Sequence, residues 1–347
     1  MSARPPAFAA KVIRWQQRHG RHDLPWQRTR NPYRIWLAEV MLQQTQVATV
    51  IPYYRRFLKR FPNLKSLAQA PLDDVLTLWS GLGYYSRARH LHHAARWIVT
   101  EQHGRFPRDF ESVLALPGIG RSTAAAICAF AFGARRAILD GNVKRVFARC
   151  FGIAGWPGTP KIEAKLWALA EALLPRRGIA AYTQGLMDLG ATICTRGKPR
   201  CGACPLRGAC VALKGNKVSK LPSPRPRQTL PRKRAHMLIL LRDGEVLLEK
   251  RAPSGIWGGL WSLPEAQPGD DIAALCRRRY GAEIAPPAPL ASISHGFSHF
   301  RFDIEPACCA VTRLIPAVGE PGTLWLPLED ALGAAIPAPV RRILGAL

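Results

Sequence analysis

The 347-residue sequence contains no apolar run near the roughly 20 residues that a membrane span needs. Its beginning lacks the apolar stretch and cleavage site of a secretory signal, so we expect a cytoplasmic protein with thiols that are free or metal-bound. Acidic residues are scarce, because 23 Asp and Glu stand against 50 Lys and Arg, a net charge of +27. A monomeric enzyme that acts on small neutral substrates does not need so large a positive charge. A protein that binds a polyanionic partner does. The 48% hydrophobic content excludes a disordered basic tail.

The net positive charge comes from the first two-thirds of the chain. Residues 1–213 carry 32 basic and 11 acidic side chains, residues 214–234 carry 8 and none, and residues 235–347 carry 10 and 12. Proline alternates with Lys and Arg in the middle segment, which is typical of a semi-rigid linker. Apolar residues recur at helical spacing before it. After it, residues 236–249 predict a hairpin turning at Asp243 and Gly244, with later strands near 290–312. The sequence therefore predicts a mainly helical region, a basic linker and an α+β domain.

Four cysteines gather within 17 residues, with the spacing C-x6-C-x2-C-x5-C. They are Cys194, Cys201, Cys204 and Cys210. This spacing suits one metal centre, either an iron–sulfur cluster or zinc. The spacing alone does not separate the two, although a first gap of six residues is unusual for a zinc ribbon.

Residues 116–123 (LPGIGRST) predict a turn between two helices. Gly118 and Gly120 let backbone N–H groups face outward and approach a ligand closely. The start of the second helix adds its positive dipole end. We expect this turn to hold a phosphodiester without sequence preference.

Two carboxylates stand out as candidates for acid catalysis. Glu39 lies in a predicted helix that is apolar nearly all round, so burial should raise its pKa and suit it to donate a proton. Asp140 precedes another predicted helix and is a candidate N-cap. Acid-assisted cleavage of a glycosidic bond needs such a pair, one acid for the leaving group and one carboxylate facing the cationic sugar.

The cysteines and four further stretches carry a family resemblance. The stretches are residues 36–47 (WLAEVMLQQTQV), 81–89 (GLGYYSRAR), 116–123 and 138–145 (ILDGNVKR). The chain resembles the helix–hairpin–helix DNA glycosylases, and among them the adenine-specific MutY-type family, over nearly its whole length. The resemblance implies a six-helix barrel at about 25–134 and a cluster domain built from 1–24 and 135–213. It also implies a linker at 214–234 and a Nudix-like domain at 235–347 that senses 8-oxoguanine.

The same resemblance implies an activity and residue roles. It implies a monomeric, nucleoid-associated bacterial enzyme that excises adenine mispaired with 8-oxoguanine or guanine from double-stranded DNA. Glu39 is expected to be the general acid, Asp140 the carboxylate at the sugar, and Asn142 a residue that helps hold the site. The four cysteines are expected to bind one 4Fe–4S cluster. The expected contacts with DNA or the lesion are Gln44, Thr45, Leu82, Tyr84, Gly118, Gly120, Ser122, Phe297, Ser298 and His299.

Ser122 bears on the alternative functions. In similar enzymes that cut oxidised pyrimidines and nick the strand, as endonuclease III does, a nucleophilic lysine stands at this place. Serine cannot form a Schiff base, which indicates hydrolysis without strand cleavage. An oxidised-pyrimidine glycosylase/lyase is the alternative enzyme, and Ser122 and the C-terminal domain argue against it. A catalytically silent DNA-binding scaffold is another, and the presence of both Glu39 and Asp140 argues against that.

In the C-terminal domain, residues 258–265 (GGLWSLPE) resemble the opening of a Nudix motif. Arg277, Arg278 and Arg279 stand where the active motif has a Glu-rich helix for Mg²⁺. We therefore interpret the domain as a recognition module, with nucleotide sanitation as its alternative function. Residues 297–299 (FSH) match the loop that touches the oxidised guanine in the family.

Overall fold

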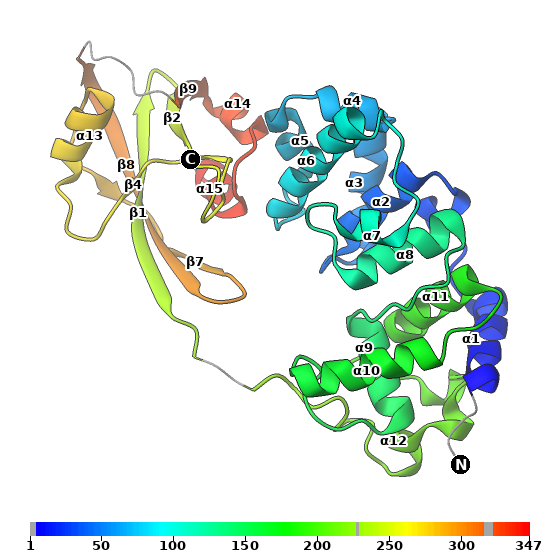
Figure 1. The fold of residues 1–347 in the computed structure, drawn as a ribbon. Coiled ribbons are helices and arrows are strands. Elements are labelled where there is room, and N and C mark those ends of the chain that lie inside the picture. Colours follow the sequence, from blue (N-terminus) through cyan, green and yellow to red (C-terminus); the bar gives the residue numbers. More distant parts are fainter. Residues whose placement is uncertain (1–4, 227–228, 316–321) are drawn as a thin grey trace. The chain divides into compact units, whose positions relative to one another are not determined.

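The computed structural model describes residues 5–226, 229–315 and 322–347 (Figure 1). The chain divides into two compact units, one of Met1–Gln69 with His93–Arg227 and one of Ala70–His92 with Gln228–Leu347. Among the described helices, none is both long and apolar enough to cross a membrane. The predicted fold class, a mainly helical N-terminal region followed by an α+β C-terminal domain, is confirmed.

The first unit is helical. Its elements are α1 (Pro5–His19), η1 (Pro25–Arg28), α2 (Pro32–Leu42), α3 (Val47–Arg60), α4 (Leu64–Gln69), α7 (Phe110–Leu114), α8 (Arg121–Phe132), α9 (Gly141–Phe151), α10 (Pro160–Ala172), α11 (Ile179–Asp188), the π-helical turn η2 (Leu189–Ile193), η3 (Cys201–Ala203), η4 (Arg207–Ala209) and α12 (Val211–Lys214). Helix α6 (Ser86–Glu101) starts in the second unit and ends in the first.

One hydrophobic core joins α1 to the helices after residue 120. Phe8 of α1 packs near Phe147 of α9, with ring centroids 6.0 Å apart, and α1 lies along α11 (Figure 1). The helical stripe expected around Val143, Val146 and Cys150 is buried in this core, as predicted. The core brings the N-terminal helix against the segment that carries Asp140 and the cysteines.

The second unit is built on a mixed sheet. Its strands are β1 (Arg232–Arg242), β2 (Glu245–Lys250), β3 (Trp261–Ser262), β4 (Glu265–Ala266), β5 (Ala282–Ile284), β6 (Ala288–Pro289), β7 (Ile293–Gly296), β8 (Arg301–Leu314) and β9 (Thr323–Pro327). The described order is β3-β2-β1-β8-β5. β4 also pairs with β1, β6 and β7 with β8, and β9 with β2. β1 and β8 run parallel, and the other pairs are antiparallel. The helices are α5 (Leu72–Trp79), α13 (Ile272–Tyr280), α14 (Leu328–Gly333) and α15 (Ala338–Leu344).

The predicted hairpin and later strands are confirmed. Asp243 and Gly244 have φ of 50° and 80°, the pair of positive values that a two-residue type I′ turn requires. β7 and β8 are the strands expected near 290–312. β1 begins at Arg232, so the last three residues of the expected linker belong to the sheet.

The early part of the expected linker packs on the first unit. Leu221 is 7% exposed, and its carbonyl accepts a hydrogen bond from Arg149 Nε at 2.8 Å. The Ser223 hydroxyl accepts one from the Gly155 N–H at 3.2 Å. Residues 227–228, in the middle of the expected linker, lie outside the described residues.

Candidate active site

Helix α2 carries Glu39 and is apolar on nearly every side, as predicted. Asn31 caps it by accepting a hydrogen bond from the Arg34 N–H at 3.2 Å, and Pro32 occupies its first turn. Seven of its eleven residues are buried. Glu39 itself remains partly exposed, so a substrate can reach a carboxylate that protein otherwise surrounds.

Asp140 is the N-cap of α9, as expected, and its Oδ1 accepts a hydrogen bond from the Val143 N–H at 2.7 Å. The preceding residue is held too, because the Ser122 hydroxyl of α8 accepts a hydrogen bond from the Leu139 N–H at 3.0 Å. The cap and this contact together fix where the Asp140 carboxylate stands. Ser122 thus positions the backbone next to Asp140.

The electrostatics of the two carboxylates differ. Burial, and after it the negative charge of Asp140, raises the pKa of Glu39 from its usual 4.5 to about 8. Burial also raises the pKa of Asp140, but hydrogen bonds from Val143 and Asn142 and the charge of Arg145 oppose that rise. Two like charges in one site disfavour double ionisation. With a pKa of about 8, Glu39 keeps its proton at neutral pH, and Asp140 is the carboxyl whose anion the chain supports with hydrogen bonds and a positive charge.

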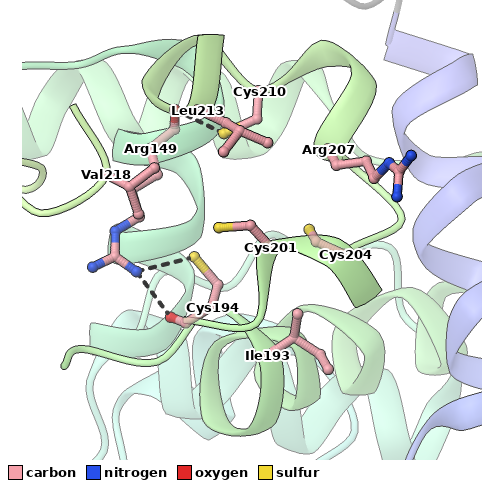
Figure 2. Close-up of a pocket in the computed structure, with 9 residues that line it drawn as sticks. All are labelled: Arg149, Ile193, Cys194, Cys201, Cys204, Arg207, Cys210, Leu213 and Val218. Carbon is pink, nitrogen blue, oxygen red and sulfur yellow. Dashed lines mark hydrogen bonds between the residues drawn. The ribbon is translucent and has the colours of Figure 1, made fainter. Parts of the chain in front are cut away.

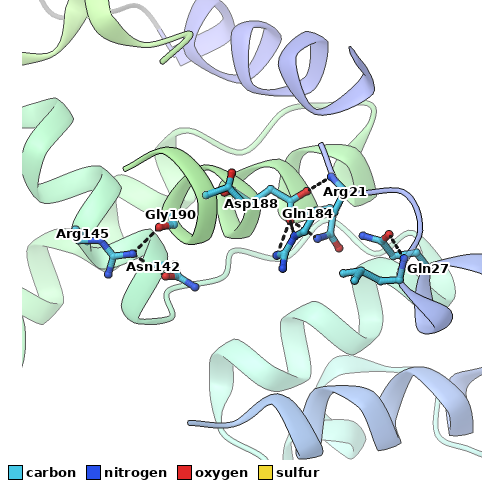
Figure 3. Close-up of polar contacts among 9 residues, drawn as sticks. Arg21, Gln27, Asn142, Arg145, Gln184, Asp188 and Gly190 are labelled. Atoms are coloured by element: carbon cyan, nitrogen blue, oxygen red, sulfur yellow. Dashed lines mark hydrogen bonds and ion pairs between the residues drawn. The ribbon is translucent and has the colours of Figure 1, made fainter. Parts of the chain in front are cut away.

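A polar network supports the start of α9 (Figure 3). Arg145 Nη2 donates to Asn142 Oδ1 and to the Gly190 carbonyl, both at 2.7 Å, and its Nε donates to the Cys194 carbonyl at 2.7 Å. A Cβ on Gly190 would stand 2.4 Å from that of Asn142, so only glycine fits there. Arg145 thereby ties the candidate site to η2 and to the first of the four cysteines.

The residue immediately before η2, Asp188, forms an ion pair with Arg21 (Figure 3). Asp188 is fully buried and accepts from the Arg21 N–H at 2.9 Å and from Arg21 Nε at 2.7 Å. Gln184 Nε2 adds a third hydrogen bond at 2.9 Å. The segment after α1 is thus locked onto α11, and π-helical turns such as η2 are frequent at functional sites.

The turn predicted between two helices lies between α7 and α8. Gly118 has a φ of 76°, and Gly120 is the N-cap of α8 with open space around it. Gln43 Nε2 donates to the Gly118 carbonyl at 3.2 Å, which ties this turn to the end of α2. Gln44 follows, exposed, with a positive φ of 57°, and Thr45 is partly exposed.

In the second unit, the other lesion candidates gather around a cavity of about 720 Å³. Tyr84 is 51% exposed with a φ of 50°, a conformation that costs energy for a bulky residue. Tyr84 lines this cavity together with Phe297, Ser298 and His299. Leu82, by contrast, is 5% exposed and does not line it. Two segments more than 200 residues apart in the chain thus share one cavity.

The four cysteines line one cavity in the first unit (Figure 2). Arg149 is 4% exposed, and its Nη1 donates to Cys194 Sγ at 3.4 Å. Burial raises the pKa of Cys204 to about 11, so a bound cation would have to displace the thiol proton. In the described ranges no three His, Cys, Asp or Glu side chains are arranged to hold a single metal ion. The lining offers four thiols and no carboxylate or imidazole, so the kinds of donor, though not their arrangement around a single ion, suit a four-thiolate centre.

The sequence of this chain matches two known protein families and several curated proteins. Residues 37–172 match the HhH-GPD superfamily of base excision DNA repair proteins, and residues 235–346 match the NUDIX domain. Adenine DNA glycosylase of Buchnera aphidicola (subsp. Acyrthosiphon pisum) is 38% identical over 338 residues, which cover 97% of this chain and 96% of that protein. The human adenine DNA glycosylase is 32% identical over 97% of this chain and 73% of its own length.

The chain belongs to the adenine DNA glycosylase family.

Solved structures support the fold of this adenine DNA glycosylase family member. A thermostable thymine-DNA glycosylase is 30% identical with a TM-score of 0.56, covering 61% of this chain and 97% of its own. A non-covalent endonuclease III–DNA complex shares the fold at 22% identity and a TM-score of 0.52, over 60% of this chain and 94% of that one.

Three residues that support the site of this adenine DNA glycosylase family member, Arg145, Arg21 and Asp188, were not among the predicted site residues. Arg145 lies inside a quoted motif, three residues after Asn142, a spacing that places both side chains on one face of a helix. That signal was available in the sequence. Arg21 and Asp188 are 167 residues apart, and only the packing of α1 against α11 brings them together.

Proposed function

We propose that this chain hydrolyses the N-glycosidic bond of adenine in DNA mispaired with 8-oxoguanine or guanine. One observation carries the chemistry: Glu39, with a pKa of about 8, lies within electrostatic reach of Asp140. A neutral acid beside an anion is the arrangement that acid-assisted cleavage of a glycosidic bond requires. The net charge of +27 matches duplex DNA as the partner.

In the proposed mechanism, adenine leaves the base stack and enters the site, at a cost of a few kcal/mol. Glu39 delivers its proton to a nitrogen on the imidazole edge of the base as the bond to the sugar breaks. Asp140 faces the positive charge that develops on the sugar, and its hydrogen bond from Val143 keeps it there. Asn142, held by Arg145, supports Asp140.

The reaction proceeds without a covalent amine intermediate. Ser122 is engaged with the Leu139 backbone and cannot form a Schiff base. Lys144, the nearest amine in sequence to Asp140, pairs with Glu163 at 2.7 Å. Water is therefore the final nucleophile, and the strand is left intact. An assay on a duplex with an oxidised pyrimidine should show neither base release nor nicking.

The preference for 8-oxoguanine opposite the adenine is assigned to the second unit. Tyr84 presents an exposed ring at the cavity that Phe297, Ser298 and His299 also line. The Ser298 hydroxyl and His299 Nδ1 lie 3.3 Å apart and offer polar atoms for an oxidised purine edge. The aromatic rings supply stacking surface.

Base release from defined mispairs tests this function. The full chain should release adenine from A:8-oxoguanine and A:G duplexes in single turnover, with a higher rate for the former. The double variant Ser298→Ala/His299→Ala should retain excision but lose several-fold of that preference. A preference unchanged in the variant would remove the sensing role from this loop, and absence of adenine release from either duplex would contradict the function itself.

The four cysteines are proposed to hold one 4Fe–4S cluster with a structural role. The cluster would supply charge and rigidity to the loop after η2, and no step of the reaction uses it. The support is the set of four sulfurs around one cavity, together with Arg149 beside Cys194. Purified protein should be yellow-brown and contain about four irons per chain. A colourless, folded protein with stoichiometric zinc would refute this assignment.

A further inference from the structure

A second cavity in the second unit, of about 500 Å³, has no part in the proposed function. Its charged lining residues are Lys233, Glu249, Arg251, Glu265 and Arg279. They come from β1, β2, β4 and α13, and from the loop after β2. Three cations against two carboxylates leave the cavity with an excess of positive charge, in a C-terminal segment (residues 235–347) that is slightly acidic as a whole.

Both carboxylates are already neutralised by the chain. Arg251 donates to both oxygens of Glu265, at 2.5 and 3.4 Å. Arg279 Nη2 donates to Glu249 Oε1 at 3.0 Å, and the Tyr280 hydroxyl donates to Glu249 Oε2 at 2.6 Å. Every carboxylate oxygen of the pair therefore accepts a hydrogen bond, which leaves this pair poorly suited to ligate a cation.

The donors of this cavity are held in position. Arg251 is fixed by Glu265 and by the Ile256 carbonyl, which accepts from its Nε at 2.8 Å, and a guanidinium still has further N–H groups to offer. Lys233 adds an ammonium group 5.1 Å from the centre of the Phe300 ring. Ser262 also lines the cavity, is 1% exposed, and its hydroxyl has no hydrogen-bond partner among the described residues. That hydroxyl is a buried donor that a bound anion would satisfy.

We propose that this cavity binds a phosphoryl group directly, without a metal ion. Phosphoryl oxygens accept hydrogen bonds only, and fixed guanidinium and ammonium groups are the donors that recognise them. The group belongs either to a free diphosphate or to the backbone of the bound duplex. The second source is open because the cavity shares Lys233, Gly255 and Ile256 with the larger cavity that Tyr84 lines.

Inorganic pyrophosphate with EDTA is the probe, applied to the full chain. The readout is the rate at which an acylating reagent labels each lysine, followed by mass spectrometry. Pyrophosphate should slow the labelling of Lys233 several-fold. Lys250 is the internal control, because it pairs with Asp73 at 2.5 Å and lines neither of these two cavities. A site-resolved readout is needed because the strongly basic first unit also attracts polyanions.

Three variants separate a built site from diffuse charge. Arg279→Ala should weaken pyrophosphate binding about tenfold. Arg277→Ala, two positions earlier on the same helix, should leave pyrophosphate binding unchanged. The Arg277 side chain is 66% exposed and does not line the cavity. Glu249→Gln should tighten binding several-fold by removing a negative charge. A gain in affinity cannot arise from partial unfolding, so this variant keeps the proposal falsifiable if Arg279→Ala folds poorly.

A parallel arm replaces pyrophosphate with an A:8-oxoguanine duplex. Protection of Lys233 by pyrophosphate assigns a free phosphate ligand, and protection by the duplex alone, lost in Arg279→Ala, assigns a backbone phosphate. Either result supports the proposal. Protection by neither probe, protection that requires added Mg²⁺, or equal weakening in Arg277→Ala overturns it. The pyrophosphate arm needs no base excision, so its failure is distinct from failure of the proposed activity.

Discussion

Replacing Glu39 with Gln should abolish adenine excision and at the same time stabilise the free protein. Gln keeps the shape of the side chain and can hydrogen-bond, but it cannot deliver a proton. General acids contribute about 10²–10⁴-fold to the rate, so a single-turnover rate constant should fall at least about a hundredfold. Affinity for the mispaired duplex should be preserved, because the contacts with the DNA backbone remain.

The gain in stability follows from the pKa of Glu39, which rises from 4.5 in an exposed carboxyl to about 8 in the folded protein. Above a pH of 4.5 the unfolded chain releases this proton and the folded chain keeps it. Stability is therefore lost as the pH rises from 4.5 toward 8, by about 1.4 kcal/mol per pH unit. Near neutral pH the wild type should carry a penalty of roughly 3 kcal/mol that Glu39→Gln removes.

Chemical denaturation of both proteins at acidic and neutral pH measures this difference. Glu101→Gln, the same change on an exposed residue of α6, is the matched control and should alter neither rate nor stability. The wild-type excision rate should also fall as the pH passes about 8 and Glu39 loses its proton. Near-normal excision by Glu39→Gln, or an equal response of the two proteins to pH, would refute the assignment of the acid.

Four further predictions concern the surroundings of the site. Asp140→Asn should keep the helix cap and thus the stability, yet lower the single-turnover rate at least about a hundredfold. Gly118→Ala should weaken binding to every duplex alike in a mobility-shift titration, because a φ of 76° is strained for alanine. Gly120 has open space around it, so Gly120→Ala should leave the melting temperature of the protein unchanged. Arg145→Ala should slow excision about tenfold with duplex affinity retained, since Asn142 then loses its support. Cys194→Ser should lower the iron content and the visible absorbance, and it should reduce thermal stability more than the rate of the remaining folded enzyme.

Much of the fold and of the site was open to prediction from local patterns. The helical stripe of α9, the Asp-Gly turn between β1 and β2 and the N-cap at Asp140 depend on residues within a few positions of one another. The apolar surroundings of Glu39 were also visible, because they belong to its own helix. Such features follow from backbone periodicity and short-range hydrogen bonding, which a sequence displays directly.

The sequence by itself thus determined the elements, the candidate acid and anion, the four thiols and the charge that favours DNA. Tertiary structure alone decided which groups interact. Asp140 helps to raise the pKa of Glu39, 101 positions away in the sequence. Arg21 pairs with Asp188, 167 positions away, and Tyr84 shares a cavity with His299. The positive cavity around Arg251 and Arg279 likewise depends on α13 packing beside the sheet. The physical reason is that desolvation and charge coupling depend on distances through space, and these are set by how the hydrophobic faces of separate elements pack.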